Sequence, residues 1–272
     1  MIQDIYPSKL DNAFAKPKPS ENDPVMVFDE EGRLLARNEE GRIVFPTVSE
    51  AGGELRYLFA VDSARYFLSC SPGDISDYDP FPVRKLRDTG EGKELFAAFT
   101  AYHLWKWYTD NRFCGRCGSV LEDDDRERAL RCSKCGNIVY PRINPAVIVG
   151  VINGDSILIT RYRRGYAHNA LIAGFAEIGE TLEETVAREV MEEAGIKVRN
   201  IRYYKSQPWG MAQDLLTGFY CEADGDVTIR MDEGELRSAE WTKREDIELQ
   251  PNALSLTNEM MYMFKTGKEG KR

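Results

Sequence analysis

The spacing of apolar residues divides the chain into a β-rich first part and a mixed second part. Short apolar runs, such as Val25-Met26-Val27-Phe28, alternate with turn signals such as Asp29-Glu30-Glu31-Gly32, which predicts a small β-rich domain. Over residues 92–109 the apolar spacing becomes helical. The residues that mark one face of this helix are Leu95, Phe96, Phe99, Tyr102 and Trp105 or Lys106.

The later part of the chain predicts alternating strands and helices. We expect strands at 144–152 and 156–160, joined by an Asn153-Gly154-Asp155 turn, and helices at 181–194 and near 253–266. The resulting organisation is a mixed α/β (α+β) chain. Its parts are a leader arm at 1–24, a β-rich N-terminal domain at 25–110 that ends in a helix, a cysteine module at 111–142 and an α/β domain at 143–272.

Length and charge limit the classes of function. The 272 residues suffice for two or three compact units, and the net charge of −9 gives no general attraction for phosphate backbones. Such a protein can still bind a polyphosphate if divalent cations bridge the like charges. The sequence shows no secretory leader and no apolar run of membrane length, so we expect a cytoplasmic protein without a membrane partner.

Four of the six cysteines form two C-x-x-C pairs separated by fourteen residues. Each pair, followed by a glycine, predicts a tight turn with two thiolates at its tip. Two such turns provide a tetrahedral site that suits one structural Zn²⁺, because thiolates fill every position. A single redox-active pair fits this spacing less well, and the acidic segment 122–125 argues against nucleic-acid binding. The predicted ligands are Cys114, Cys117, Cys132 and Cys135, whereas Cys70 and Cys221 are expected to be buried thiols.

A helix rich in carboxylates is predicted between Thr181 and Gly195. Thr181 and Glu184 form a capping box, and Gly195 is a signal for the end of a helix. Between these signals, a buried stripe recurs every four residues, at Leu182, Val186 and Val190.

On this helix Glu189, Glu192 and Glu193 share one face and repel one another. Hard oxygen ligands gathered in this way suit Mg²⁺ or Mn²⁺, and Arg188 can hold one carboxylate through a forked hydrogen bond. The helix alone would equally suit a solvated acidic face.

The surrounding motif favours the metal site. Residues 174–196 read Gly-x5-Glu-x7-Arg-Glu-x-x-Glu-Glu-x-Gly followed by Ile196, which resembles the Nudix box at every specified position. The resemblance implies an α/β/α sandwich with a loop–helix–loop site, in which Glu189, Glu192 and Glu193 hold divalent cations and the carbonyl of Ala173 adds a ligand. The metals would activate a water and neutralise charge on the phosphate oxygens.

Flanking motifs resemble the NAD(H) pyrophosphatase branch of this family. They are the preceding cysteine quartet, Tyr140-Pro141-Arg142, the segment Ser206-Gln207-Pro208-Trp209 and the acidic Glu235. The branch implies a homodimer that cuts a dinucleotide substrate, NADH plus water giving NMNH plus AMP, and the same chemistry would remove an NAD cap from the 5′ end of RNA. Catalytic roles are implied for Arg188, Glu189, Glu192, Glu193 and Glu235. Substrate contacts are implied for Tyr140, Ala173, Phe175, Ser206, Gln207, Pro208, Trp209, Gly210, Met211, Ala212 and Gln213.

One segment departs from the branch. After Trp209 the chain reads Gly210-Met211-Ala212-Gln213-Asp214, where the branch carries Pro-Phe-Pro-x-Ser. Fewer prolines predict a less rigid loop, and Trp209 would equally suit a core aromatic that anchors it. A Nudix hydrolase for ADP-ribose or a dinucleoside polyphosphate is therefore a second hypothesis. A third hypothesis is a zinc-ribbon adaptor that senses a nucleotide without cutting it. Nudix domains that have lost catalysis usually lose their carboxylates, and this sequence keeps them.

Overall fold

A computed structural model describes residues 1–73, 75–88, 92–164 and 168–270. Two compact units follow from the contacts within the chain. The N-terminal unit comprises Ile2–Ile143 with Trp209–Gln213, and the C-terminal unit comprises Met1, Asn144–Pro208 and Asp214–Arg272. No helix among the described residues is long and apolar enough to cross a membrane.

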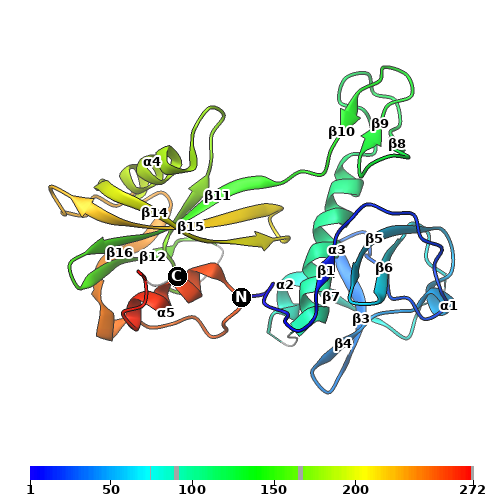
Figure 1. Cartoon of the computed structure of the whole chain (residues 1–272), viewed down its shortest axis with the longest axis horizontal. Coiled ribbons are helices and arrows are strands. Elements are labelled where there is room, and N and C mark those ends of the chain that lie inside the picture. The colour runs from blue at the N-terminus through cyan, green and yellow to red at the C-terminus, as the bar shows by residue number, and fades with distance from the viewer. Residues whose placement is uncertain (74, 89–91, 165–167, 271–272) are drawn as a thin grey trace. The chain divides into compact units, whose positions relative to one another are not determined.

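The N-terminal unit is built on two small sheets, as the short apolar runs predicted (Figure 1). The four-stranded sheet has the order β1 (Leu10–Asp11), β5 (Leu55–Val61), β6 (Ala64–Ser69), β2 (Val25–Met26). The three-stranded sheet has the order β4 (Arg42–Val44), β3 (Arg33–Glu39), β7 (Asp79–Pro82). The short helices α1 (Val48–Ala51) and α2 (Val83–Leu86) complete this part of the unit.

The long helix α3 (Gly92–Asp110) confirms the helix predicted at 92–109, but its predicted face is partly wrong. Trp107, which lay outside that face, is fully buried, whereas Trp105 is half-buried and stacks on Phe28 with ring centroids 5.0 Å apart. The buried residues of the helix also include Ala97, Ala98, Ala101 and Leu104. A single stripe of apolar residues cannot describe the buried surface of a helix that packs against different neighbours along its length.

The cysteine module forms a third sheet in the N-terminal unit, with the order β10 (Ile138–Val139), β9 (Leu130–Arg131), β8 (Glu122–Asp123). Its core contains Trp107 at the end of α3 together with Leu121, Leu130 and two of the cysteines. Within the acidic segment, Asp124 is buried and pairs with Arg131 at 2.6 Å.

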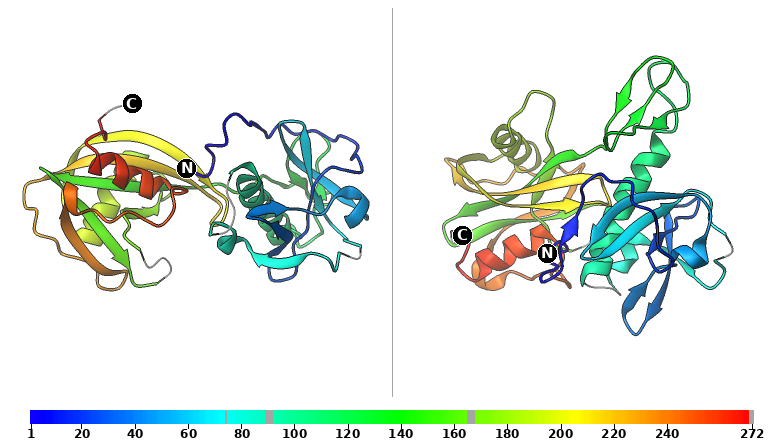
Figure 2. Two further views of the ribbon diagram at one scale, coloured as in Figure 1. Left: turned by 90° about the horizontal axis from the view of Figure 1, so that it is seen from below. Right: turned by 45° about the vertical axis from the view of Figure 1, so that its right-hand side comes forward.

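The C-terminal unit contains one sheet with the order β14 (Lys197–Trp209), β15 (Asp214–Asp224), β11 (Asn144–Asn153), β12 (Ser156–Tyr162), β16 (Leu236–Lys243), and β13 (Ile172–Phe175) pairs with β11. Helices α4 (Leu182–Ala194) and α5 (Leu256–Lys265) lie on opposite faces of it (Figures 1 and 2), and the short η1 (Arg244–Asp246) follows β16. The predicted strands and helices of this domain are confirmed.

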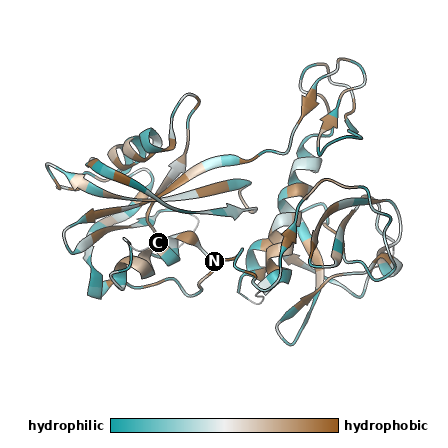
Figure 3. Ribbon diagram, viewed as in Figure 1, coloured by the Kyte–Doolittle hydropathy of each residue, from teal (hydrophilic) through white to brown (hydrophobic). Residues whose placement is uncertain are grey.

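Strand β11 contributes to the hydrophobic core on each face of this sheet. Val147, Val149 and Val151 belong to the core that contains the buried residues of α4, and Ile148 belongs to the core that contains α5. Alternate residues of a strand point to opposite faces, so a strand covered on both sides reads as a continuous apolar run. Along the strands and helices, hydrophobic residues are interspersed with hydrophilic ones (Figure 3). The α/β/α sandwich is confirmed.

The two cysteines outside the module differ in environment. Cys221 is buried in the core beneath α4, as predicted, and burial raises the pKa of its thiol to about 12. Cys70 is exposed just after β6, so the prediction that it is buried is wrong. It follows the last apolar residue of its strand, beyond the point where the sheet covers the side chains.

Candidate active site

Helix α4 begins and ends where its capping signals predicted. The side chain of Thr181 accepts a hydrogen bond from the backbone N–H of Glu184, and the Glu184 carboxylate accepts one from the backbone N–H of Thr181 at 2.7 Å. Gly195 ends the helix in the left-handed conformation with φ of 68°. These caps fix the position along the helix of the three glutamates in its last two turns.

Glu193 is the most buried of the three glutamates, with 2% of its surface exposed. Its two carboxylate oxygens lie 3.2 Å from the hydroxyl of Tyr162 on β12, which also accepts a hydrogen bond from the amide of Ala173. Burial raises the pKa of Glu193 to about 8, and the charges of Glu189 and Glu235 act in the same direction. This carboxylate therefore occupies a place where a negative charge is costly without a nearby cation.

Glu189 packs tightly against β13. A Cβ atom built on Gly174 would lie 2.0 Å from the Glu189 carboxylate, so the first glycine of the motif leaves room for that side chain. Burial raises the pKa of Glu189, although hydrogen bonding to Arg188 opposes the shift. Glu192 is largely exposed and contacts Arg188 at 2.9 Å.

Arg188 connects these carboxylates. Its forked hydrogen bonds go to Glu180, at 2.6 and 2.9 Å, and it also donates to Glu189, to Glu192 and to the carbonyl of Phe175. The pair with Arg188 lowers the pKa of Glu180 to about 2. Arg188 thus anchors the loop before α4 to the helix as well as orienting the carboxylates of Glu189 and Glu192.

The carboxylates suit a hard divalent cation by their chemistry. Glu235, an exposed residue directly before β16, contributes a negative charge that raises the pKa of both Glu189 and Glu193, so four acidic groups share one electrostatic site. Oxygen ligands of this kind are those that Mg²⁺ and Mn²⁺ prefer. Burial raises the pKa of both Glu189 and Glu193, and a bound cation would favour their charged forms, so in this respect the residues fit the predicted metal site.

The cysteine quartet is a complete metal site by geometry. The four sulfur atoms of Cys114, Cys117, Cys132 and Cys135 all lie within 4.8 Å of one another, and among the described residues no other set of three or more candidate ligands does so. A backbone N–H from Ser119 is the main cause that lowers the pKa of Cys117, to about 6. A tetrahedron of thiolates next to turn amides is a structural zinc site.

Comparison with known proteins agrees with both sites. A family model described as "NUDIX domain" matches residues 142–262, and one described as "NADH pyrophosphatase zinc ribbon domain" matches residues 110–140. A protein from Klebsiella pneumoniae (strain 342) called "NAD-capped RNA hydrolase NudC" is 45% identical over 178 residues, which cover 64% of this chain and 67% of that protein. The chain belongs to the Nudix hydrolase family. Its zinc ribbon is the one that accompanies the NAD(H) pyrophosphatase branch, as the motifs predicted.

Further relatives give the same picture. Proteins of the same name from Enterobacter sp. (strain 638) and Escherichia coli (strain K12 / DH10B) are each 43% identical; the matches cover 62% and 64% of this chain and 65% and 67% of those proteins. A solved Nudix hydrolase from Nitrosomonas europaea has a TM-score of 0.52 and 21% identity, and covers 59% of this chain and 94% of its own. This last likeness supports the Nudix fold.

The predicted substrate residues lie in several parts of the Nudix protein. Phe175 is exposed at the end of β13, next to half-buried Ala173. Tyr140 belongs to the N-terminal unit, where the residue is 55% exposed and its hydroxyl donates to Glu127 at 2.9 Å. Gln207 is buried and uses its amide for the backbone of Leu254 and Leu256, so its side chain fixes the strand that ends in this segment. Ser206 and Pro208 lie beside it in β14.

The segment Trp209–Gln213, which contains four of the five departing residues, packs within the N-terminal unit. The Trp209 ring meets Phe99 of α3 edge-on with centroids 5.4 Å apart, and a Cβ atom on Gly210 would lie 2.1 Å from the Phe99 carbonyl oxygen. Gln213 is buried with φ of 61°, whereas Met211 is half-buried and Ala212 is exposed. The alternative reading of Trp209 as an anchor in the core is favoured by this packing.

Three residues of the C-terminal unit with notable surroundings had no predicted role. Tyr162 hydrogen-bonds Glu193, Glu180 binds Arg188, and Asp214 is a buried acid whose Oδ1 has no partner among the described residues. Only Glu180 carried a signal, because the Nudix motif specifies a glutamate there. Tyr162 and Asp214 gain their environments from tertiary packing.

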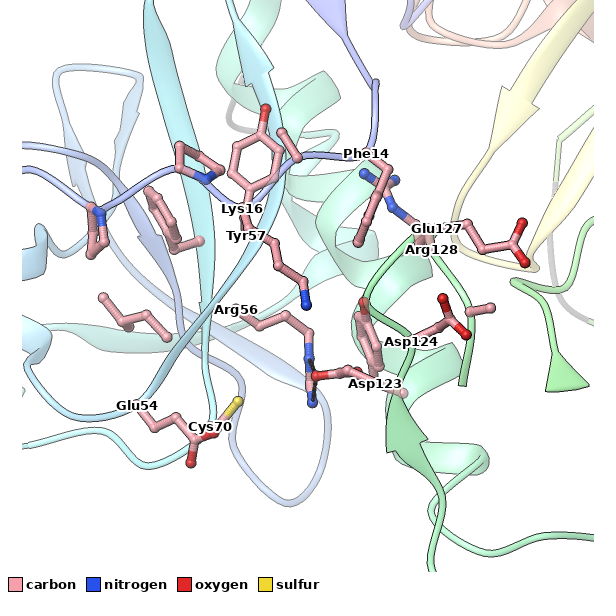
Figure 4. A pocket seen from close by; sticks show the side chains of 17 residues that line it. Phe14, Lys16, Glu54, Arg56, Tyr57, Cys70, Asp123, Asp124, Glu127 and Arg128 are labelled. Atoms are coloured by element: carbon pink, nitrogen blue, oxygen red, sulfur yellow. Dashed lines mark hydrogen bonds and ion pairs between the residues drawn. The ribbon is translucent and has the colours of Figure 1, made fainter. Parts of the chain in front are cut away.

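The N-terminal unit also contains a cavity of about 250 Å³ between the arm at 14–19, β5 and the zinc ribbon (Figure 4). Arg56 pairs with Asp123 at 2.8 Å and lies 4.1 Å from the centre of the Tyr108 ring. Lys16 pairs with Asp125, and Arg128 donates to the backbone carbonyl of Leu58. Because these cations already have acceptors, we interpret the cavity as a packing hollow.

Proposed function

We propose that this protein hydrolyses the diphosphate bond of NADH or NAD⁺, and that it removes the NAD cap from RNA by the same reaction. Water adds to one phosphorus atom while the bridging P–O bond breaks, which gives NMN(H) and AMP. The observation that carries the proposal is the buried Glu193 within a complete Nudix box, directly after a zinc ribbon of the NADH pyrophosphatase type. Relatives named as NAD-capped RNA hydrolases support the extension to capped RNA.

Within this proposal, Glu189, Glu192, Glu193 and Glu235 hold Mg²⁺ or Mn²⁺, and the Ala173 carbonyl adds a ligand. Such cations would neutralise charge on the diphosphate and lower the pKa of the attacking water. Tyr162 holds the Glu193 carboxylate in place through its hydroxyl. Arg188 orients Glu189 and Glu192 by one hydrogen bond to each.

The substrate contacts follow from exposed rings and from the loop after β14. The Phe175 ring is exposed at the edge of the carboxylate site and is suited to stack on a base. We assign the same role to Tyr140, and we assign the shaping of the dinucleotide pocket to the segment 206–213. Zinc in the ribbon is structural, with one ion per chain.

We also propose that the protein is a cytoplasmic homodimer. All six cysteines are free, and four are arranged for metal binding, which suits a reducing compartment. The dimer is implied by the family branch. Light scattering coupled to size-exclusion chromatography tests it, and a monomer at micromolar concentration would contradict it.

Product analysis tests the reaction. The full-length protein is incubated with NADH and Mg²⁺ or Mn²⁺, and the products are separated by chromatography. We expect NMNH and AMP in equal amounts and no reaction after chelation. Glu193→Gln should abolish the products, whereas Glu183→Gln, an exposed glutamate of α4 outside the cluster, should retain them. Cleavage that survives chelation would contradict the proposal.

A second candidate substrate is ADP-ribose. The observation that favours it is the changed loop, in which Gly210 packs against α3 and the buried acid Asp214 occupies the place of the serine of the branch. A panel of substrates at equal concentration decides between them. ADP-ribose cleaved faster than NADH would replace our proposal, and NADH bound without turnover would indicate a nucleotide sensor.

A further inference from the structure

The C-terminal unit contains a second charged feature, an open hollow of about 440 Å³ walled by arginines. Of the residues that the structure describes, those lining it are Arg163, Arg164, Gly234 and Arg237. The first two arginines follow the end of β12, and Arg237 lies in the neighbouring strand β16. All three side chains are exposed.

These three arginines differ from other exposed arginines of the same unit. Arg199 faces Glu222 and Asp224, and Arg230 pairs with Asp226 at 2.7 Å. Within the described ranges, no carboxylate lies within 4.0 Å of the guanidinium groups that line the hollow. Three like charges around one hollow repel one another, and an anion bound between them would remove that repulsion.

The chain segments that line the hollow adjoin residues of the carboxylate site in the sequence and through one backbone hydrogen bond. The backbone N–H of Arg163 donates to the carbonyl of Glu235 at 2.9 Å, and the preceding residue, Tyr162, points its hydroxyl at Glu193. Arg237 is only two residues from Glu235 on the other strand. A substrate whose diphosphate lies at the carboxylates therefore has a place for a second anionic group close by.

We propose that this arginine hollow binds a phosphate group that the substrate carries outside the diphosphate that is cut. The inference rests on the proposed function. Two compounds with the same dinucleotide diphosphate carry such a group: NAD-capped RNA, with a 3′-phosphodiester after the adenosine, and NADPH, with a 2′-phosphate. Guanidinium groups bind phosphate through paired hydrogen bonds, which suits either source.

The charge of the whole protein limits how far this attraction extends. The net charge is −9, and the screening length in physiological salt is about 8 Å. The hollow thus acts on the one or two phosphates nearest the adenosine, while the rest of an RNA chain experiences no general attraction.

The kinetic test uses the full chain with all three arginines replaced by alanine. We compare kcat/KM for NADH, for NADPH and for an NAD-capped oligonucleotide, with Arg199→Ala as the matched control. In the triple variant, kcat/KM for the phosphate-bearing substrate, divided by kcat/KM for NADH, should fall about tenfold or more. The reason is that hydrogen bonds to a charged group are lost. A fall confined to the oligonucleotide identifies RNA as the source, and a fall confined to NADPH identifies the 2′-phosphate. Ratios within twofold of the wild type for both would overturn the inference.

A binding test separates this inference from the proposed reaction. Calorimetry in the presence of a chelator compares AMP with adenosine 3′,5′-bisphosphate and adenosine 2′,5′-bisphosphate. The wild type should bind one bisphosphate at least about tenfold more tightly than AMP, and the triple variant should lose that advantage. Equal affinities in the wild type would overturn the inference even if NADH is cleaved. A wild type that cleaves none of the three substrates but retains the preference would refute only the proposed function.

Discussion

The zinc ribbon and the carboxylate site that we propose to bind a divalent cation are sites of different kinds in one chain. The four thiol sulfurs lie within 4.8 Å of one another, whereas among the described residues the glutamates do not form such a cluster. Instead, Tyr162 hydrogen-bonds Glu193, and Arg188 binds Glu189 and Glu192. The ribbon presents a set of ligands ready for a permanent ion, whereas protein groups hydrogen-bond the glutamates, and under our proposal a divalent cation binds there with the substrate.

The largest effect expected from this difference is the loss of activity in Glu193→Gln. A catalytic metal contributes several kcal/mol, so we expect the rate with NADH to fall on the order of 10³-fold. The amide matches the shape of the acid and can still accept from Tyr162, so the fold should survive. Steady-state kinetics and circular dichroism measure the two effects, with Glu183→Gln as the control. A fall of less than tenfold would show that Glu193 is not a metal ligand.

Removing a zinc ligand from the ribbon should lower the free energy of unfolding of the protein. Cys132→Ser removes a buried ligand, and because zinc binding stabilises the fold directly, we expect zinc to be lost and the free energy of unfolding to fall by more than about 3 kcal/mol. Zinc analysis and urea unfolding give the result. Exposed Cys70→Ser should change the free energy by less than about 0.5 kcal/mol and keep the zinc. A variant that retains one zinc at normal stability would contradict a structural role.

A third test concerns the close packing at the carboxylates. Gly174→Ala places a Cβ atom 2.0 Å from the Glu189 carboxylate, so this side chain must move and the rate should fall about tenfold. The strain should cost about 1–3 kcal/mol of stability. Gly115→Ala in the ribbon meets nothing within 4 Å and is the control for kinetics and unfolding. Equal rates for Gly174→Ala and the wild type would show that the position of Glu189 is not critical.

The smallest expected effect tests a buried acid at neither metal site. Burial raises the pKa of Asp214 to about 6, so between pH 4 and pH 6 the folded state holds a proton that the unfolded state has lost. Stability should therefore decrease as pH rises through this window, by up to about 3 kcal/mol. Asp214→Asn should remove this part of the dependence in urea unfolding. Asp224→Asn, at the exposed end of β15, should leave it unchanged. If Asp214→Asn and the wild type show the same dependence of stability on pH, Asp214 is not the group that causes it.

The comparison of the two sites also explains what the sequence predicts well. Each C-x-x-C turn and the capped helix α4 are local, because their spacing alone brings ligands to one turn or one face. The helix boundaries at Thr181 and Gly195 were therefore predictable from the residues themselves.

Contacts between elements were not predictable in this way. Tyr162 reaches Glu193 from β12, and the contact between Gly174 and Glu189 depends on how β13 passes beneath α4. On α3, Trp107 is buried because the ribbon core surrounds it, which the periodicity of that helix alone does not show. The exposure of Cys70 likewise depends on where the sheet ends, not on the apolar residues before it.

The packing of Gly210 on α3 has a consequence for engineering the enzyme. Exchanging this loop for the Pro-Phe-Pro array of the family branch would put a proline at position 210. Its ring would collide with the carbonyl oxygen of Phe99, which leaves no space there for even one added carbon atom. The loop and the helix can therefore be swapped only together. In a chimera, the boundary of the transplanted segment must include Phe99 as well as residues 209–213.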